Sequence, residues 1–86
     1  MDASQLALYK FDGCPYCQRV QAALQRLGTQ IEQRDTQKND AFRKELIEAT
    51  GRATVPVLRI QEADGRVRWM PESLDIVRFL EENFGK

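Results

Sequence analysis

The first third of the chain constrains the fold more than any other part of the sequence. Residues 5–10 are a short, mostly apolar stretch that predicts a strand, and the polar turn that ends in Gly13 interrupts it. A helix is predicted over residues 15–27, because apolar side chains then recur at helical spacing: Val20, Ala23, Leu24 and Leu27. Pro15 suits its first turn, and Gly28 stands where a C-terminal cap is expected. A strand that leads directly into a helix indicates a βα unit.

The remainder of the chain predicts three more strands and two more helices. Asp64-Gly65 is a strong hairpin signal between two of these strands, and Trp69 on the returning strand is expected to pack in the core or at the edge of the sheet. In chain order, the elements are an edge strand over residues 30–34, a helix capped by Asn39 or Asp40 and ended by Gly51, strands over residues 56–61 and 67–70, and a helix that opens at residues 71–73 and ends before Gly85.

A βαβ unit requires parallel strands, whereas the hairpin requires an antiparallel pair, so both fit only in a mixed sheet. We therefore expect an α/β fold in the order β-α-β-α-β-β-α, with a four-stranded mixed sheet and three helices. A chain of 86 residues has room for one ordinary domain, which we place at residues 1–86.

The charge balance and the residues that are missing exclude several function classes. Thirteen Lys and Arg against thirteen Asp and Glu leave no net charge, so no general attraction to nucleic acid or to an anionic membrane is expected. The chain has no histidine, which excludes Ser-His-Asp and Cys-His catalysis. Its start lacks a secretory signal pattern, and no apolar run approaches the roughly 20 residues of a membrane span. We therefore expect a cytoplasmic protein.

The two cysteines, Cys14 and Cys17, stand at the predicted junction between strand and helix. A C-x-x-C pair in a βαβ setting is typical of a thioredoxin-like redox site. Cys14 falls at the helix N-terminus, where free N–H groups and the helix dipole favour a thiolate, and Lys10 and Arg19 add positive charge nearby. Cys17 is expected one turn inside, as an ordinary thiol. Cys14 is therefore predicted to attack a disulfide, and Cys17 to resolve the mixed disulfide.

Two other interpretations of the cysteine pair stay open. The pair is either inert and buried, or it is half of a zinc site. Structural zinc usually takes four nitrogen or sulfur ligands, and this chain supplies two, so only a symmetric dimer could complete the set. The strand-to-helix setting favours redox chemistry, and no metal is expected.

The sequence Cys-Pro-Tyr-Cys at residues 14–17 resembles the centre of the dithiol glutaredoxins, small oxidoreductases of the thioredoxin fold that use glutathione. Thr54-Val55-Pro56 resembles the Thr-Val-Pro loop of the same family. The resemblance implies that Pro56 is cis and packs beside Cys14, and that the backbone of Val55 pairs with the cysteine part of glutathione. From the residues alone, the favoured interpretation of Pro56 is a proline at a strand edge, and only the cysteine motif upstream reverses this preference.

A third match is Glu72-Ser73 at the start of the last helix, where the family binds the γ-glutamyl end of glutathione. A helix N-terminus suits a carboxylate, and Glu72 could pair with the ligand's ammonium group. The resemblance further implies that Tyr16 shapes the glutathione groove and that Arg43 touches the glycine carboxylate. From the residues alone, Ser73 is an N-cap and Arg43 is a solvated surface side chain.

The chain also departs from typical glutaredoxins. Met70-Pro71 stands where they have a Gly-Gly pair, and Phe11 stands where they have a lysine. Lys10, one position earlier, is a further candidate for contact with glutathione. Residues 70–77 resemble instead the N-terminal domain of glutathione-transferase-like glutaredoxins. We expect the helical domain that follows in those proteins to be absent, because the sequence ends at Lys86.

The resemblance implies a glutathione-dependent oxidoreductase that reduces protein disulfides and glutathione mixed disulfides through Cys14, with Cys17 or glutathione as the resolving thiol. Glutathione is then the co-substrate, and the partners are disulfide-bonded or glutathionylated proteins; a monomer is expected. Two alternatives stay open. One is a dimeric module in which Cys14 and glutathione ligate a [2Fe–2S] cluster, and the other is a thioredoxin-like reductase fed by a flavoenzyme.

Overall fold

The computed structural model describes residues 1–85, and its elements follow the predicted order. The predicted domain extends to Lys86, which lies outside the described residues. None of the helices within residues 1–85 combines the length and apolar character that crossing a membrane demands. After a short 3₁₀ helix at Ala3–Gln5, the elements are β1 (Leu6–Lys10), α1 (Pro15–Leu27), β2 (Glu32–Asp35), α2 (Asp40–Thr50), β3 (Val57–Gln61), β4 (Val67–Met70) and α3 (Ser73–Phe84).

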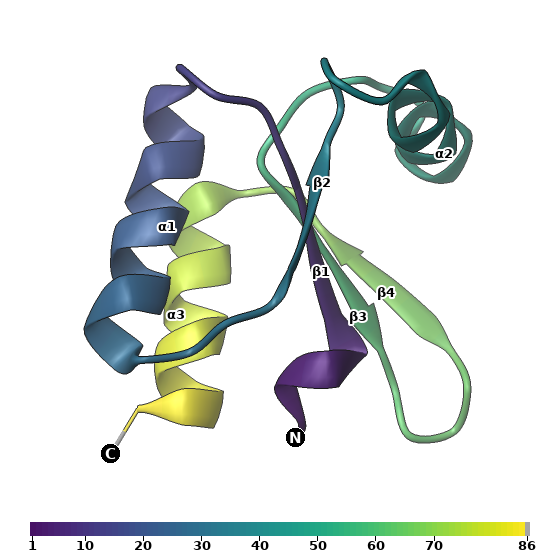
Figure 1. The fold of residues 1–86 in the computed structure, drawn as a ribbon. Coiled ribbons are helices and arrows are strands. Elements are labelled where there is room, and N and C mark those ends of the chain that lie inside the picture. Colours follow the sequence, from purple (N-terminus) through teal and green to yellow (C-terminus); the bar gives the residue numbers. More distant parts are fainter. Residues whose placement is uncertain (86) are drawn as a thin grey trace.

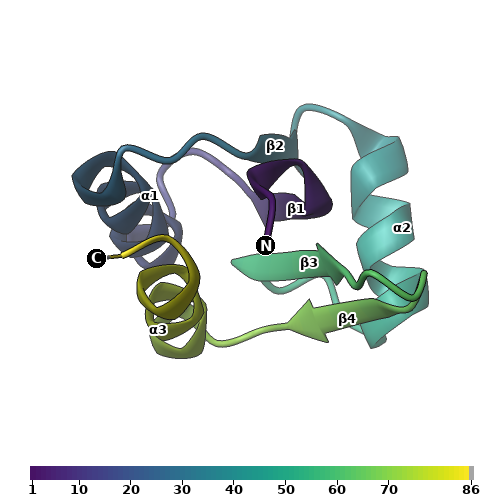
Figure 2. The same cartoon turned by 90° about the horizontal axis from the view of Figure 1, so that it is seen from below.

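The four strands form one mixed sheet in the order β2-β1-β3-β4. β1 runs parallel to β2 and antiparallel to β3, and β4 pairs antiparallel with β3. Helices α1 and α3 lie side by side (Figure 1). Figure 2 shows these two helices on one face of the sheet and α2 on the other. The predicted α/β fold, a thioredoxin-like arrangement of a four-stranded mixed sheet and three helices, is confirmed.

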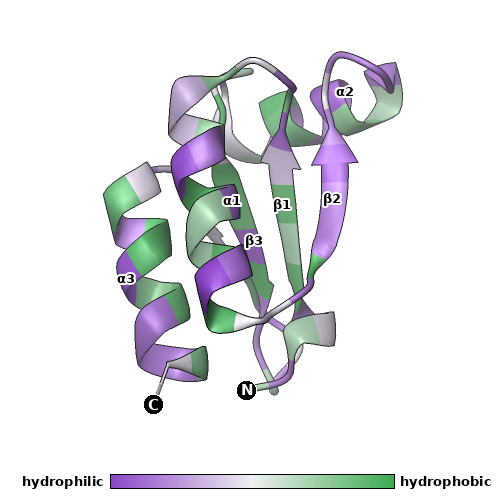
Figure 3. Ribbon diagram, turned by 60° about the vertical axis from the view of Figure 1, so that its left-hand side comes forward, coloured by the Kyte–Doolittle hydropathy of each residue, from purple (hydrophilic) through white to green (hydrophobic). Residues whose placement is uncertain are grey.

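The main core lies between the sheet and the helix pair α1 and α3. Alternate side chains of a strand share a face, so Leu6 and Leu8 of β1 point toward these helices, as do Leu58 and Ile60 of β3. The helices contribute five buried side chains: Val20, Leu24, Ile76, Phe79 and Leu80. In Figure 3, β2 is hydrophilic along its length whereas hydrophobic residues dominate β3. This difference matches the position of β2 at the edge of the sheet and of β3 within it.

A smaller core holds α2 against the opposite face of the sheet. Tyr9 of β1 is fully buried there, and its ring centroid lies 5.4 Å from that of Trp69, so Trp69 packs on the sheet as predicted. The Tyr9 hydroxyl donates to the carboxylate of Glu45 on α2 and accepts a hydrogen bond of 2.7 Å from Arg34 of β2. The remaining members of this core are Leu46 and Val57, with Phe42 and Val55 packed against them.

The ends of the first two helices are set by the residues that the sequence indicates. Pro15 is the first residue of α1, and Gly28 caps its C-terminus with a φ of 65°, a left-handed conformation that glycine adopts without steric cost. The side chain of Asn39 caps α2 by accepting a hydrogen bond of 3.0 Å from the N–H of Ala41.

The bounds of three strands differ from the prediction. β3 begins at Val57 rather than at Pro56. β1 begins at Leu6 rather than at Gln5, because Gln5 belongs to the 3₁₀ helix, whose N-terminus Asp2 caps in a capping box with Gln5. β2 spans Glu32–Asp35 instead of residues 30–34, since its pairing with β1 runs from Glu32 to Asp35.

Candidate active site

Cys14 occupies the N-cap position of α1, directly after a tight turn. Gly13 precedes it with a φ of 87°, a left-handed conformation that favours glycine. The Cys14 Sγ accepts a hydrogen bond of 3.3 Å from the backbone N–H of Cys17, as a side-chain oxygen does in an ordinary N-cap. The sulfur therefore lies where the unpaired N–H groups of α1 create a partial positive charge.

Cys17 lies in the first turn of α1 and is more deeply buried than Cys14. The two residues are free thiols, with exposed fractions of 2% and 5%. Burial, and then the hydrogen bond with Cys14, raises the pKa of the Cys17 thiol well above its usual range, against the opposing effects of the Phe11 backbone and the Lys10 charge. The expectation of an ordinary thiol at Cys17 is therefore wrong, because desolvation holds it in the protonated form.

The loop before β3 faces Cys14. Its Val55-Pro56 peptide bond is cis, as the resemblance implied, and Pro56 is buried. The carbonyl oxygen of Val55 lies 4.0 Å from the Cys14 Sγ. The tertiary fold thus brings the Thr-Val-Pro loop next to the cysteine pair, although the two motifs are 41 positions apart.

A groove of about 420 Å³ lies between this loop, α1 and α3. Cys14 adjoins it through its contact with Val55. Six of the predicted site residues line the groove: Tyr16, Thr54, Val55, Pro56, Glu72 and Ser73. The other lining residues are Arg19, Arg52, Pro71 and Leu74. The three sequence motifs therefore meet around one hollow next to the cysteines.

The N-terminus of α3 forms part of this groove. Glu72 takes the N-cap position and makes no side-chain capping bond within residues 1–85. Ser73 is the first helical residue and is buried, so its interpretation as the N-cap is wrong by one position. The first N–H groups of a helix lack partners inside the helix, and here no side chain among the described residues caps them. This end of the groove is therefore suited to an anion.

Arg43 and Lys10 are not among the lining residues of the groove. Arg43 is exposed on α2. Lys10 ends β1 on the face that α1 covers, and its Nζ lies 3.1 Å from Asp12 Oδ1 and 3.5 Å from Asp35 Oδ2. The Lys10 ammonium group therefore already has two carboxylates beside it. Contact of Arg43 or of Lys10 with glutathione stays a prediction.

Arg52 lines the groove but was not among the sequence candidates. Arg19, expected only as a charge near Cys14, also lines it, and its guanidinium lies 5.7 Å from the centroid of the Tyr16 ring. Within residues 1–85, neither arginine has a carboxylate at ion-pair distance. The signal that could have identified Arg52 is its place two positions before Thr54, in the loop that carries the Thr-Val-Pro motif.

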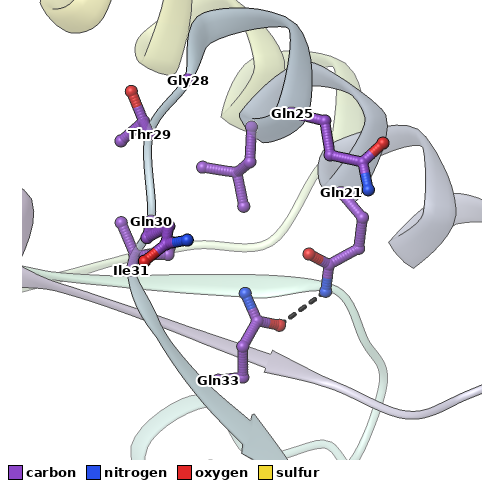
Figure 4. Close-up of a pocket in the computed structure, with 8 residues that line it drawn as sticks. Gln21, Gln25, Gly28, Thr29, Gln30, Ile31 and Gln33 are labelled. Carbon is purple, nitrogen blue, oxygen red and sulfur yellow. Dashed lines mark hydrogen bonds between the residues drawn. The ribbon is translucent and has the colours of Figure 1, made fainter.

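A larger hollow of about 680 Å³ lies between α1 and β2, away from the cysteines. Figure 4 shows Gln21 and Gln33 pointing toward each other across it, joined by a hydrogen bond of 2.5 Å. Glutamines, Thr29 and apolar residues line it, with no cysteine and no charged side chain. Among the described residues, no cluster of three or more His, Cys, Asp or Glu side chains is arranged to hold a metal ion. The groove beside Cys14 is therefore the candidate active site.

The sequence matches known proteins over nearly its whole length. Residues 8–86 match the family described as Glutathione S-transferase, N-terminal domain. Glutaredoxin 3 of Escherichia coli (strain K12) is 35% identical to this chain over 57 residues, which are 66% of this chain and 69% of the bacterial protein. Both matches agree with the motifs that surround the groove.

Solved structures share the fold. Glutaredoxin 2 from Salmonella typhimurium, solved in complex with glutathione, superposes with a TM-score of 0.74 and 29% identity over 96% of this chain. Leishmania TDR1, a trimeric glutathione transferase, superposes with a TM-score of 0.74 and 26% identity over 92% of this chain. This chain spans 35% of the length of the first structure and 18% of the second.

Proposed function

Since this chain belongs to the glutaredoxins and to the family of glutathione S-transferase N-terminal domains, we propose that it is a glutathione-dependent thiol-disulfide oxidoreductase. Its substrates are protein disulfides and mixed disulfides with glutathione, and Cys14 is its nucleophile. One observation supports this proposal most strongly: the Cys14 sulfur lies at a helix N-terminus, beside the Val55-Pro56 loop and next to an open groove.

In the first step, the Cys14 thiolate attacks one sulfur of the substrate disulfide. A new S–S bond forms between Cys14 and that sulfur, and the other sulfur leaves as a thiolate. The amides at the start of α1 favour the negative charge on Cys14 before the attack, and the N–H of Cys17 donates directly to Sγ.

In the second step, Cys17 resolves the mixed disulfide of a protein substrate. Before the attack, burial and the hydrogen bond with Cys14 keep Cys17 protonated. Once Cys14 is part of a disulfide, its sulfur is neutral, so its contribution to the raised pKa of Cys17 is lost and Cys17 ionises more easily. Two glutathione molecules then reduce the Cys14–Cys17 disulfide and leave as glutathione disulfide, which balances the two electrons given to the substrate.

The groove residues bind the glutathione. Its cysteine part pairs with the backbone of Val55, and its γ-glutamyl carboxylate accepts from the free N–H groups of α3 and from Ser73. Glu72 pairs with the ammonium group, and Tyr16 forms a wall of the groove. For the glycine carboxylate, Arg52 is a cation that lines the groove itself.

Two serine variants test the proposal. With glutathione and a small glutathione mixed disulfide as substrates, Cys14→Ser is expected to abolish turnover. Cys17→Ser is expected to retain much of this reaction, because glutathione itself can resolve the intermediate, but to lose most reduction of a protein disulfide.

The circular dichroism spectrum of each variant serves as the control for folding. Turnover by a folded Cys14→Ser variant at the rate of the parent protein would overturn the proposed function.

A further inference from the structure

Arg19 lines the groove, yet the proposed binding of glutathione gives it no role. It is exposed on α1, two positions after Cys17. Its guanidinium carbon lies 5.7 Å from the ring centroid of Tyr16, the residue that precedes Cys17. A cation and an aromatic ring attract each other at this distance, so Tyr16 helps to hold the guanidinium beside the start of α1.

The groove is cationic although the chain as a whole carries no net charge. Among its lining residues, Arg19 and Arg52 are positive and Glu72 is the single carboxylate. Neither arginine has a carboxylate at ion-pair distance within residues 1–85. The N-terminus of α3, which no described side chain caps, adds partial positive charge to the same surface. The groove therefore attracts anionic groups.

Glutathione occupies only part of this charge. It has two carboxylates and one ammonium group. In the proposed function, the N-terminus of α3 and Arg52 bind the carboxylates, and Glu72 binds the ammonium group. Arg19 is then a lining cation without a charged partner. The other reactant is the polypeptide that bears the disulfide, and an acidic side chain is the group of opposite charge that it can bring to Arg19.

We propose that Arg19 pairs with an aspartate or glutamate side chain of the substrate polypeptide, close in sequence to the cysteine that Cys14 attacks. The inference rests on the proposed function and specifies its preferred substrates as disulfides in acidic segments. An arginine suits this task, because its planar guanidinium donates two parallel hydrogen bonds to one carboxylate. Since Arg19 is exposed, the pair contributes modestly to binding and is sensitive to salt.

A series of disulfide peptides tests this assignment. Each peptide has two cysteines joined in one disulfide and a single aspartate at successive positions on either side of them. In the matched peptides, asparagine keeps the shape of that side chain and removes its charge. Each kcat/KM is divided by the uncatalysed rate at which glutathione reduces the same peptide, because aspartate also changes the reactivity of the disulfide itself.

At the favoured position, aspartate is expected to raise this normalised kcat/KM by about three- to fivefold over asparagine, the upper range for an exposed ion pair. In about 1 M sodium chloride, where the Debye length is about 3 Å, the ratio is expected to fall to about one. Equal values for aspartate and asparagine at every position would overturn the inference.

A pair of arginine variants locates the effect. Arg19→Gln is expected to reduce the aspartate-to-asparagine ratio to about one, because the cation is lost. Arg26→Gln is the matched control, since it removes the same charge from an exposed position of α1 outside the groove lining, and it should keep the ratio of the parent protein. A ratio that survives in Arg19→Gln would place the acidic side chain elsewhere and overturn the inference.

Charge reversal gives a readout that a merely structural role of Arg19 would not change. Arg19→Glu is expected to prefer lysine over asparagine at the favoured position and to disfavour aspartate there. The circular dichroism spectrum shows whether this variant is folded. A folded Arg19→Glu variant that keeps the preference for aspartate would overturn the inference. If the proposed function fails instead, the parent protein turns over neither the peptides nor a small glutathione mixed disulfide, so the two failures are distinguishable.

Discussion

The backbone N–H of Cys17 donates a hydrogen bond to the Cys14 Sγ across 3.3 Å, so one helical turn links the two thiols while giving them different surroundings. Cys14 adjoins the groove, whereas Cys17 faces the interior and burial raises its pKa. This asymmetry is what a two-step exchange needs, since the attacking and resolving thiols must not compete for the same disulfide.

The first prediction concerns thiol reactivity. We expect iodoacetamide at neutral pH to alkylate Cys14 at least about tenfold faster than Cys17, because the thiolate is the reactive form and the raised pKa of Cys17 keeps it protonated. Mass spectrometry of proteolytic peptides measures the two rates. In urea, which removes the difference in environment, the rates should converge. Equal rates in the folded protein would contradict the asymmetry.

The second prediction separates two arginines. Arg52→Gln is expected to raise the KM for glutathione by about tenfold or more, because a hydrogen bond to a charged group is worth roughly 1.5–3 kcal/mol. Arg43→Gln, which removes the same charge from an exposed position outside the groove lining, is the matched control and should raise the KM much less. Steady-state kinetics at varied glutathione concentration measures both. A larger effect of Arg43→Gln would indicate that Arg43, as the resemblance implied, binds the glycine carboxylate of glutathione.

The third prediction concerns stability at alkaline pH. Burial, and then the hydrogen bond with Glu45, raises the pKa of Tyr9 to about 12 from its ordinary value of 10.0. Between these pH values, the unfolded chain releases the proton while the folded protein keeps it, so the free energy of unfolding falls as pH rises. Below this range the contribution is fully present.

Tyr9→Phe should therefore lose stability less steeply over this pH range than the parent protein does. Urea unfolding at a series of pH values measures the slopes. Tyr16→Phe is the matched control, and the difference between the two variants isolates the buried hydroxyl. Identical slopes for Tyr9→Phe and the parent protein would show that the hydroxyl does not contribute.

The fourth prediction concerns the packing of α3. Leu80 is fully buried against the sheet, whereas Leu74 on the same helix is 62% exposed. Leu80→Ala is expected to lower the free energy of unfolding by about 2–5 kcal/mol, through lost burial and a new cavity. Leu74→Ala should change it by no more than about 0.5 kcal/mol. Chemical denaturation of both variants measures the difference, and equal losses would mean that α3 docks through another face.

The elements that sequence reasoning predicted best are those with local signals. The helix predicted over residues 15–27 and the strand predicted over residues 67–70 have the observed bounds. Periodicity, Pro15 and Gly28 all act within a few residues of the helix they delimit. The predicted bounds of β2 were wrong because they depend on its pairing with β1, which the local sequence does not reveal.

For the candidate site, too, local features were predictable from the sequence and long-range ones were not. The sequence by itself predicted the candidate residues: the cysteine pair from its place at the start of a helix, and the Thr-Val-Pro loop and Glu72-Ser73 from their resemblance to a known family. Only the tertiary structure decided that these motifs border one groove and that Arg52 lines it while Arg43 does not. The physical reason is that residue type and spacing set local conformation and reactivity, whereas the shape of a cavity depends on how strands and helices from separate parts of the chain pack together.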